Sequence, residues 1–166
     1  VFIIAYMKKN SCFIFLLCIT AATAIAQPQK TISANKKSIL ASVEKHEKEL
    51  TGLSDKIWGF AEIAMKETQS SKVLADYAEA QGFAVQRGVA DIPTAFIASF
   101  GTGKPIIAVM GEFDALPGLS QKASPVKEAL DDGAAGHGCG HNLFGAGSLG
   151  AAVAIKELIA AGKLKG

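Results

Sequence analysis

The chain has little charge imbalance and few aromatic residues, and both shortages bear on function. Its 166 residues include seventeen Lys and Arg against fifteen Asp and Glu, and aromatic side chains make up only 7% of the sequence. No basic stripe and no interleaving of basic with aromatic residues is present, so we expect no nucleic-acid partner. The length has room for one domain and not clearly for two.

The first residues have the pattern of an export signal. Lys8 and Lys9 follow Met7, an apolar run occupies residues 12–19, and small residues occupy 21–26. A charged start, a short apolar middle and an A-x-A end are typical of a secretory signal peptide. We therefore predict a signal peptide at residues 1–26, with residues 1–6 ahead of the start codon, and export to the periplasm or the medium. The alternative is a transmembrane anchor, for which the apolar run is short.

Removal of this leader changes the charge and the cysteine count. Lys8 and Lys9 leave with it, so fifteen basic residues balance fifteen acids and the net charge is zero. Cys139 becomes the only cysteine, although export implies an oxidising compartment. A lone exported cysteine is buried, reactive or metal-bound. No membrane attachment is expected after cleavage.

The hydrophobic pattern predicts one α/β domain in which helices cover a mixed sheet. Residues 27–35 are polar and predict a flexible start, and residues 36–166 form the domain. Helical spacing predicts a long helix or two short ones over 36–65, with breaks near Gly52 or Gly59. The other expected elements are helices over 70–81 and 143–161 and strands over 83–89, 94–100 and 106–110. The last of these strands is continuously apolar, which predicts burial on both faces.

Two acidic residues follow the apolar strand directly. Glu112 and Asp114 come two residues apart, so they share one face if the extended backbone continues. The carboxyl end of a strand is where open α/β sheets place their sites. Asp114 is thus a candidate to accept a hydrogen bond from a metal-bound imidazole or to bind metal directly. The alternative is a cap on a helix or turn. The polar segment that follows, residues 120–133, predicts a surface excursion that returns the chain to this place.

The most specific segment is GHGCGHN at residues 136–142. Thiolate and imidazole are good ligands for zinc and similar divalent metals. Cys139 and His141 are one residue apart, so in extended backbone both point the same way. His137 is a possible third ligand or a hydrogen bonder near the substrate. Two other interpretations stay open: a cysteine nucleophile paired with a histidine, and a purely structural loop.

Two further features favour ordinary structural roles. His46 lies between charged residues of the first predicted helix and is expected on its solvated face. The segment GAGSLG at residues 145–150 matches a dinucleotide-binding fingerprint, but a polar loop precedes it where that motif needs a strand. Small residues that let a helix pack closely explain it better.

With these residues in view, the chain resembles the M20 family of metallopeptidases and amidohydrolases, in its aminobenzoyl-glutamate hydrolase branch. The resemblance rests on GEFDALPGLSQ at residues 111–121 and GHGCGHNL at 136–143, and it covers about residues 36–166. It implies that Cys139 and His141 are metal ligands, that Asp114 supports the catalytic site, and that His137 is a site residue of open role. It also implies hydrolysis of the amide bond of an N-acyl amino acid, such as aminobenzoyl-glutamate, or of a short peptide.

The resemblance implies two metal ions in the complete enzyme, most simply zinc, with manganese or cobalt as alternatives. It also implies a lid or dimerisation domain, a general-base Glu–Glu pair and further ligands, none of which occurs in these 166 residues. An open catalytic zinc site needs about three protein ligands. We therefore expect the N-terminal part of a hydrolase, inactive alone, with oligomers formed only by the full-length protein. The alternative is a non-catalytic exported metal-binding module or a pseudogene product.

Overall fold

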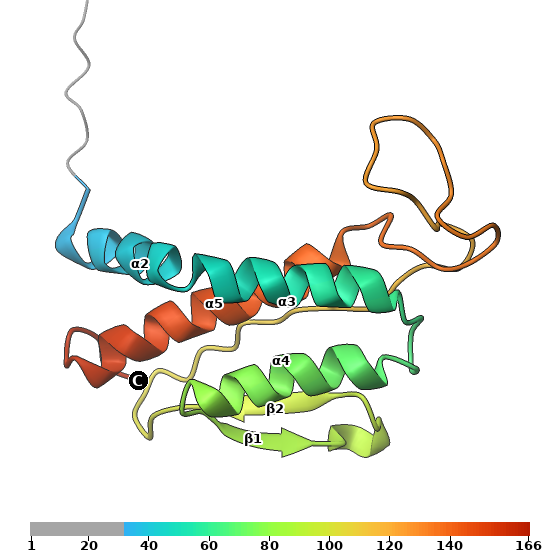
Figure 1. The fold of residues 1–166 in the computed structure, drawn as a ribbon. Helices are drawn as coiled ribbons and strands as arrows, with labels where there is room; N and C mark the ends of the chain where they lie inside the picture. The colour runs from blue at the N-terminus through green and yellow to red at the C-terminus, as the bar shows by residue number, and fades with distance from the viewer. Residues whose placement is uncertain (1–31) are drawn as a thin grey trace, which may run out of the picture. The chain divides into compact units, whose positions relative to one another are not determined.

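The computed structural model describes residues 32–166, so the predicted signal peptide lies outside the described residues. Figure 1 shows the elements of this part in order. They are the helices α2 (Ala34–Lys45), α3 (Glu47–Phe60) and α4 (Thr68–Ala80), strand β1 (Ala84–Arg87), the 3-10 turn η2 (Val89–Asp91), strand β2 (Phe96–Ser99) and helix α5 (His141–Ala160).

The first predicted helix is two helices, and it begins and breaks at other places than expected. The side chain of Ser33 accepts a hydrogen bond from the Lys36 amide at 3.3 Å and starts α2 inside the segment expected to be flexible. The break falls at His46, where ψ is 6°. Gly52 and Gly59, the expected break points, both lie within α3. A helical glycine costs only about 1 kcal/mol, which the burial of neighbouring α3 side chains offsets.

The core forms where three helices meet. Helix α5 packs against α2 and α3, and α4 packs against α3 and α5. Where α3, α4 and α5 contact one another, their apolar faces pack together and exclude water. The buried cluster consists of Leu53, Ile57, Leu74, Ala78, Ala146 and Leu149. This arrangement fixes the start of α5 relative to the end of α3. The cysteine and histidine motif at residues 136–142 leads into this start of α5.

The sheet is smaller and simpler than predicted. Strands β1 and β2 form an antiparallel pair, from Ala84 opposite Ser99 to Arg87 opposite Phe96. Helix α4 covers this pair (Figure 1). The structure thus combines helices with a two-stranded sheet, consistent with an α/β class, but the expected mixed sheet is wrong for residues 32–166.

The predicted buried strand at residues 106–110 is also different from the expectation. The run belongs to neither strand, and Ile106 and Ile107 are 86% and 74% exposed. Strands of a parallel sheet are buried because helices cover both faces of the sheet. Within the described residues no strand pairs with this run, so its apolar side chains stay in solvent.

The predicted close packing of α5 holds at two of the three glycines in residues 145–150, while Gly147 has nothing within 4 Å of its Cβ position. A Cβ atom on Gly145 would lie 2.9 Å from the Glu112 carbonyl oxygen, and one on Gly150 would lie 2.7 Å from Leu50 Cδ1. At Gly145 the close atom is backbone, so a side chain there would force α5 away, whereas at Gly150 the Leu50 side chain could turn aside. By length and composition α5 is also apolar enough to cross a membrane, but it packs against α2, α3 and α4 as a core helix does.

Candidate metal centre

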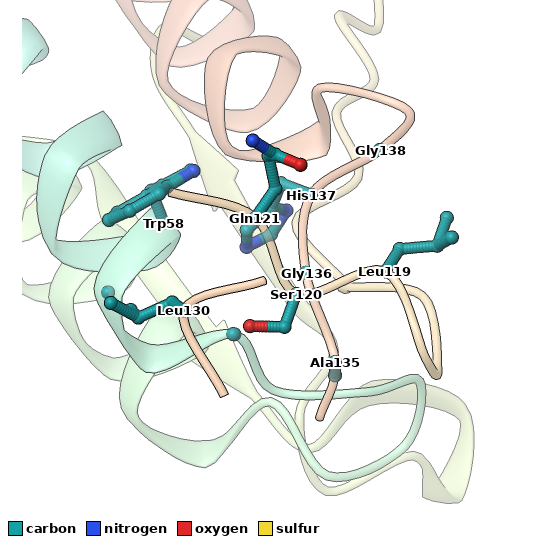
Figure 2. Close-up of a pocket in the computed structure, with 11 residues that line it drawn as sticks. Trp58, Leu119, Ser120, Gln121, Leu130, Ala135, Gly136, His137 and Gly138 are labelled. Atoms are coloured by element: carbon teal, nitrogen blue, oxygen red, sulfur yellow. The ribbon is translucent and has the colours of Figure 1, made fainter. Parts of the chain in front are cut away.

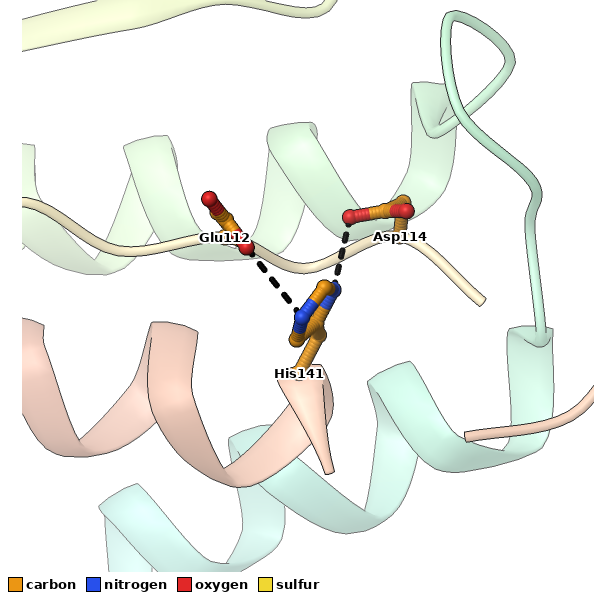
Figure 3. A group of neighbouring side chains, drawn as sticks. All are labelled: Glu112, Asp114 and His141. Atoms are coloured by element: carbon orange, nitrogen blue, oxygen red, sulfur yellow. Dashed lines mark hydrogen bonds and ion pairs between the residues drawn. The ribbon is translucent and has the colours of Figure 1, made fainter. Parts of the chain in front are cut away.

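The imidazole of His141 is held between two carboxylates. Its Nδ1 atom lies 2.8 Å from Asp114 Oδ1, and its Nε2 atom lies 3.1 Å from Glu112 Oε2 (Figure 3). His141 is the first residue of α5 and follows Gly140, whose φ of 76° turns the chain into the helix. The side chain therefore projects from the helix start toward the extended segment that carries both acids.

The extended segment presents its two acids on one side, as the two-residue spacing predicts. Backbone hydrogen bonds to two other parts of the chain hold this segment in place. The Ala115 amide donates to the Glu62 carbonyl at 2.7 Å, and Leu116 pairs with Gly136 through two backbone hydrogen bonds. The second pairing brings the end of the 120–133 excursion back beside the acids, as predicted. Gly145 lets α5 approach the Glu112 backbone, which sets the distance from imidazole to carboxylate.

Glu112, Asp114 and His141 form a group that fits a divalent cation. One ligand atom from each residue lies within 4.8 Å of the other two. Adjacent ligands of a tetrahedral zinc, with bonds of about 2.0–2.1 Å, are separated by roughly 3.3 Å. The 3.1 Å between His141 Nε2 and Glu112 Oε2 is close to that separation. Nitrogen and carboxylate oxygen suit zinc, and also manganese or cobalt.

Cys139 lies outside this group. It is an exposed free thiol, and the three-residue cluster does not include it. The premise that Cys139 and His141 share extended backbone is wrong, because Gly140 adopts a left-handed conformation and α5 begins at the next residue. A left-handed glycine followed by helix does not preserve the two-residue alternation of a strand. The role of Cys139 as a ligand stays a prediction.

His137 is oriented by the end of α3. Its Nε2 atom lies 3.0 Å from the Ile57 carbonyl oxygen, which only accepts, so Nε2 carries the proton and donates. The Nδ1 atom is buried and has no hydrogen-bond partner within residues 32–166. Burial, more than any other cause, lowers the pKa of His137. The ring is thus neutral at neutral pH, with its free lone pair on Nδ1.

Asn142 is a positioning residue that the sequence reasoning missed. Its buried Nδ2 atom donates to Ser54 Oγ at 3.0 Å, which ties the first turn of α5 to the middle of α3. Because His141 is the neighbouring residue in the same turn, this contact also fixes its position. The signal was a polar residue at the start of an otherwise apolar helix, where a buried amide needs a partner from another element.

His137 also lines a small cavity. Figure 2 shows Trp58, Ser120, Leu130 and His137 around it. Its volume is about 160 Å³, and it opens between the end of α3 and the segments 119–121 and 135–138. The excursion loop and the histidine motif therefore meet over the last turn of α3.

Comparison with known proteins finds a similar hydrolase subunit. No family model matches the chain. The chain is 46% identical over 117 residues to a subunit of the p-aminobenzoyl-glutamate hydrolase of Escherichia coli (strain K12). The match covers 70% of this chain and 24% of that protein, so the chain spans about a quarter of the length of the relative. The predicted resemblance to this branch of the M20 amidohydrolases is confirmed.

Proposed function

We propose that the chain is part of a metal-dependent amidohydrolase of the M20 type and supplies one side of its metal centre. The observation that carries the proposal is the imidazole of His141 between Asp114 and Glu112. These residues lie in the two segments that resemble the family, and the chain is 46% identical to a hydrolase subunit over 117 residues.

The donor set fits the metal that the resemblance implies. Asp114 accepts from Nδ1–H of His141, which leaves Nε2 as the nitrogen for the metal, and a carboxylate behind a ligating histidine is a common second partner. His141 and Cys139 would hold the ion, with Glu112 close enough to His141 to join them. When bound, such an ion polarises a scissile carbonyl and lowers the pKa of water. Zinc is the simplest choice, with manganese or cobalt as alternatives.

The residues of this chain have separate tasks in that site. Asp114 fixes the tautomer and direction of His141. Asn142 and Gly145 hold the start of α5 against the segment that carries the acids. His137 is neutral and turned toward α3, so it borders the centre as an acceptor rather than as a charged group. The family's general-base glutamate, second metal site and remaining ligands belong to polypeptide outside these 166 residues.

The substrate proposed is an amide of an N-acyl amino acid or a short peptide. The relative's name gives p-aminobenzoyl-glutamate as the substrate of that protein, and we propose the same class for the longer form of this one. We also propose export, a lid or dimerisation domain in the longer protein, oligomers formed through it, and no hydrolysis by residues 27–166 alone.

Hydrolysis assays on the longer protein test this proposal. We expect release of p-aminobenzoate from p-aminobenzoyl-glutamate, loss of activity with a chelator, and recovery with zinc or manganese. His141→Ala is expected to lower kcat/KM at least about 100-fold, since ligands and their partners contribute this much. Glu128→Gln, on the exposed excursion loop, is the matched control. Activity that resists chelators but is lost on alkylation of Cys139 would replace the metal mechanism with a thiol one.

A further inference from the structure

Glu62 caps helix α4 from outside the helix. The residue at the cap position, Glu67, makes no side-chain hydrogen bond to the helix, and its buried carboxylate accepts from the Thr94 hydroxyl at 2.8 Å. Glu62 lies in the loop between α3 and α4, and its carboxylate accepts from the amides of Gln69 at 3.0 Å and Ser70 at 2.8 Å. A carboxylate here satisfies free N–H groups and lies at the positive end of the helix dipole. The side chain of Glu62 is thus anchored to the start of α4.

This anchor depends on an ionised carboxylate. Burial raises the pKa of Glu62, but hydrogen bonds from the first three residues of α4 outweigh burial, and the pKa lies below its ordinary value. Hydrogen bonds to an ionised acceptor are stronger than those to a neutral one. The carboxylate is therefore charged at neutral pH and holds the loop firmly to the helix.

The backbone of the same residue holds the segment that carries the two acids. The Glu62 carbonyl accepts from the Ala115 amide at 2.7 Å, and Ile63 pairs with Ala115 in an isolated parallel bridge. The Ala115 amide belongs to the peptide unit that joins it to Asp114. Within residues 32–166 no backbone to backbone hydrogen bond involves residues 106–114. The Glu62 carbonyl is therefore the nearest backbone anchor of Asp114.

The loop around Glu62 adopts a disfavoured backbone. Ala61 and Met65, on either side of it, have φ angles of 46° and 65°. Residues with a side chain rarely adopt this left-handed conformation. It persists where surrounding contacts determine it, and it is often found near functional sites. The contacts of the Glu62 side chain and carbonyl supply that determination here.

We propose that Glu62 is a positioning residue for the metal centre, because it joins the start of α4 to the peptide unit of Asp114 and so holds that carboxylate against His141 Nδ1. Its importance for a metal and a substrate rests on the proposed function, whereas its effect on the contact between Asp114 and His141 does not. The alternative is that Glu62 only stabilises α4. In that case its loss would lower stability without changing how the His141 ring is held.

NMR of the histidine ring N–H groups in the metal-free chain at neutral pH separates these alternatives. The chain has three histidines, and His141→Ala identifies the signal of the His141 Nδ1–H group. The Nε2–H group of His46, which donates to Glu157 at the opposite end of α3, is the internal reference. Glu62→Ala removes the carboxylate, and Glu62→Gln keeps one acceptor oxygen without the charge. Ser33→Ala is the matched control, because it removes a side-chain cap from α2.

We expect Glu62→Ala to speed exchange of the His141 Nδ1–H group with water at least about tenfold, since a region opens more easily once its contacts are lost. The His46 signal should not change. Glu62→Gln should give a smaller increase, because a neutral amide is a weaker acceptor. Ser33→Ala should lower stability and leave the His141 signal as it is.

Unchanged exchange at His141 in Glu62→Ala overturns the proposal, and so does equal acceleration at His46 and His141. The same acceleration at His141 in Ser33→Ala also overturns it. If Glu62→Ala does not fold, the same comparison is made with Glu62→Gln. None of these readouts involves metal or hydrolysis, so failure of the proposed function is seen separately in the hydrolysis assays.

Discussion

The imidazole Nε2 of His46 lies 3.0 Å from Glu157 Oε1, and its Nδ1 lies 3.2 Å from the Tyr77 hydroxyl. The carboxylate only accepts, so Nε2 donates to it, and the tyrosine hydroxyl donates to Nδ1. His46 is only 8% exposed, which shows that its expected place on a solvated helix face is wrong. Through this one ring the start of α3 is joined to α4 and to the C-terminal part of α5.

Acid is expected to weaken this connection. Hydrogen bonds from His46 and Lys45 lower the pKa of Glu157 from 4.5 to about 2. A carboxyl whose pKa is lower in the folded state stabilises the fold above its unfolded pKa and loses that contribution as the pH falls through the folded pKa. Glu157→Gln should lower the free energy of unfolding by about 1–2 kcal/mol at pH 7, discounted for partial exposure. The difference should vanish between about pH 5 and pH 2.

Urea unfolding of both proteins across this pH range measures the effect. Glu128→Gln, whose partner Lys122 is exposed, is the control and should change stability by less than about 0.5 kcal/mol. A Glu157→Gln effect that is equally large at pH 3 and pH 7 would show that the carboxylate charge contributes nothing.

Gly145→Ala should move His141 away from Glu112 in the proposed metal centre. The new Cβ would meet the Glu112 carbonyl oxygen at 2.9 Å, and backbone cannot move away as a flexible side chain does. We expect the free energy of unfolding to fall by about 1–3 kcal/mol and the distance between His141 and Glu112 to increase. Gly147→Ala is the matched control, because nothing lies within 4 Å of its Cβ. It should be neutral or stabilising by up to about 1 kcal/mol. Thermal unfolding of both variants separates the two outcomes.

Asn142→Ala should destabilise the junction of α3 and α5. Removal of the amide leaves the buried Ser54 hydroxyl without its donor, and an unmatched buried group costs about 1–3 kcal/mol. The double variant with Ser54→Ala should cost less than the sum of the two single changes, since both groups of the pair are then absent. Additive losses in this double-mutant cycle would mean that the contact contributes no coupling.

Lysine substitutions in the exposed apolar run at residues 106–110 should make the chain less prone to aggregate. Ile107→Lys combined with Met110→Lys replaces two exposed apolar side chains, and lysine on an exposed strand edge opposes association. We expect less aggregation at equal concentration by light scattering, with a melting temperature unchanged within the effect of a surface substitution. As a comparison, lysine at the buried positions Ile57 and Leu74 should unfold the core.

The sequence predicted those features that local pattern determines. Helix α4, both strands of the pair, helix α5 and the common side of Glu112 and Asp114 follow from periodicity and spacing. The burial of His46 was not predictable, because its partners Tyr77 and Glu157 come from distant parts of the chain. The direction of Cys139 relative to His141 depends on the left-handed backbone conformation of Gly140. The sequence alone does not specify that conformation. The run at 106–110 was recognised as strand-like, but pairing needs neighbours that local pattern cannot supply.

Zinc titration of the chain by calorimetry tests the metal centre most directly, with His141→Ala and Asp114→Ala compared against Glu128→Gln. We expect His141→Ala to weaken zinc binding at least about tenfold, Asp114→Ala to weaken it to a similar or smaller extent, and the control to bind as the unaltered chain does. Equal zinc affinity in all four proteins would contradict a metal centre at His141.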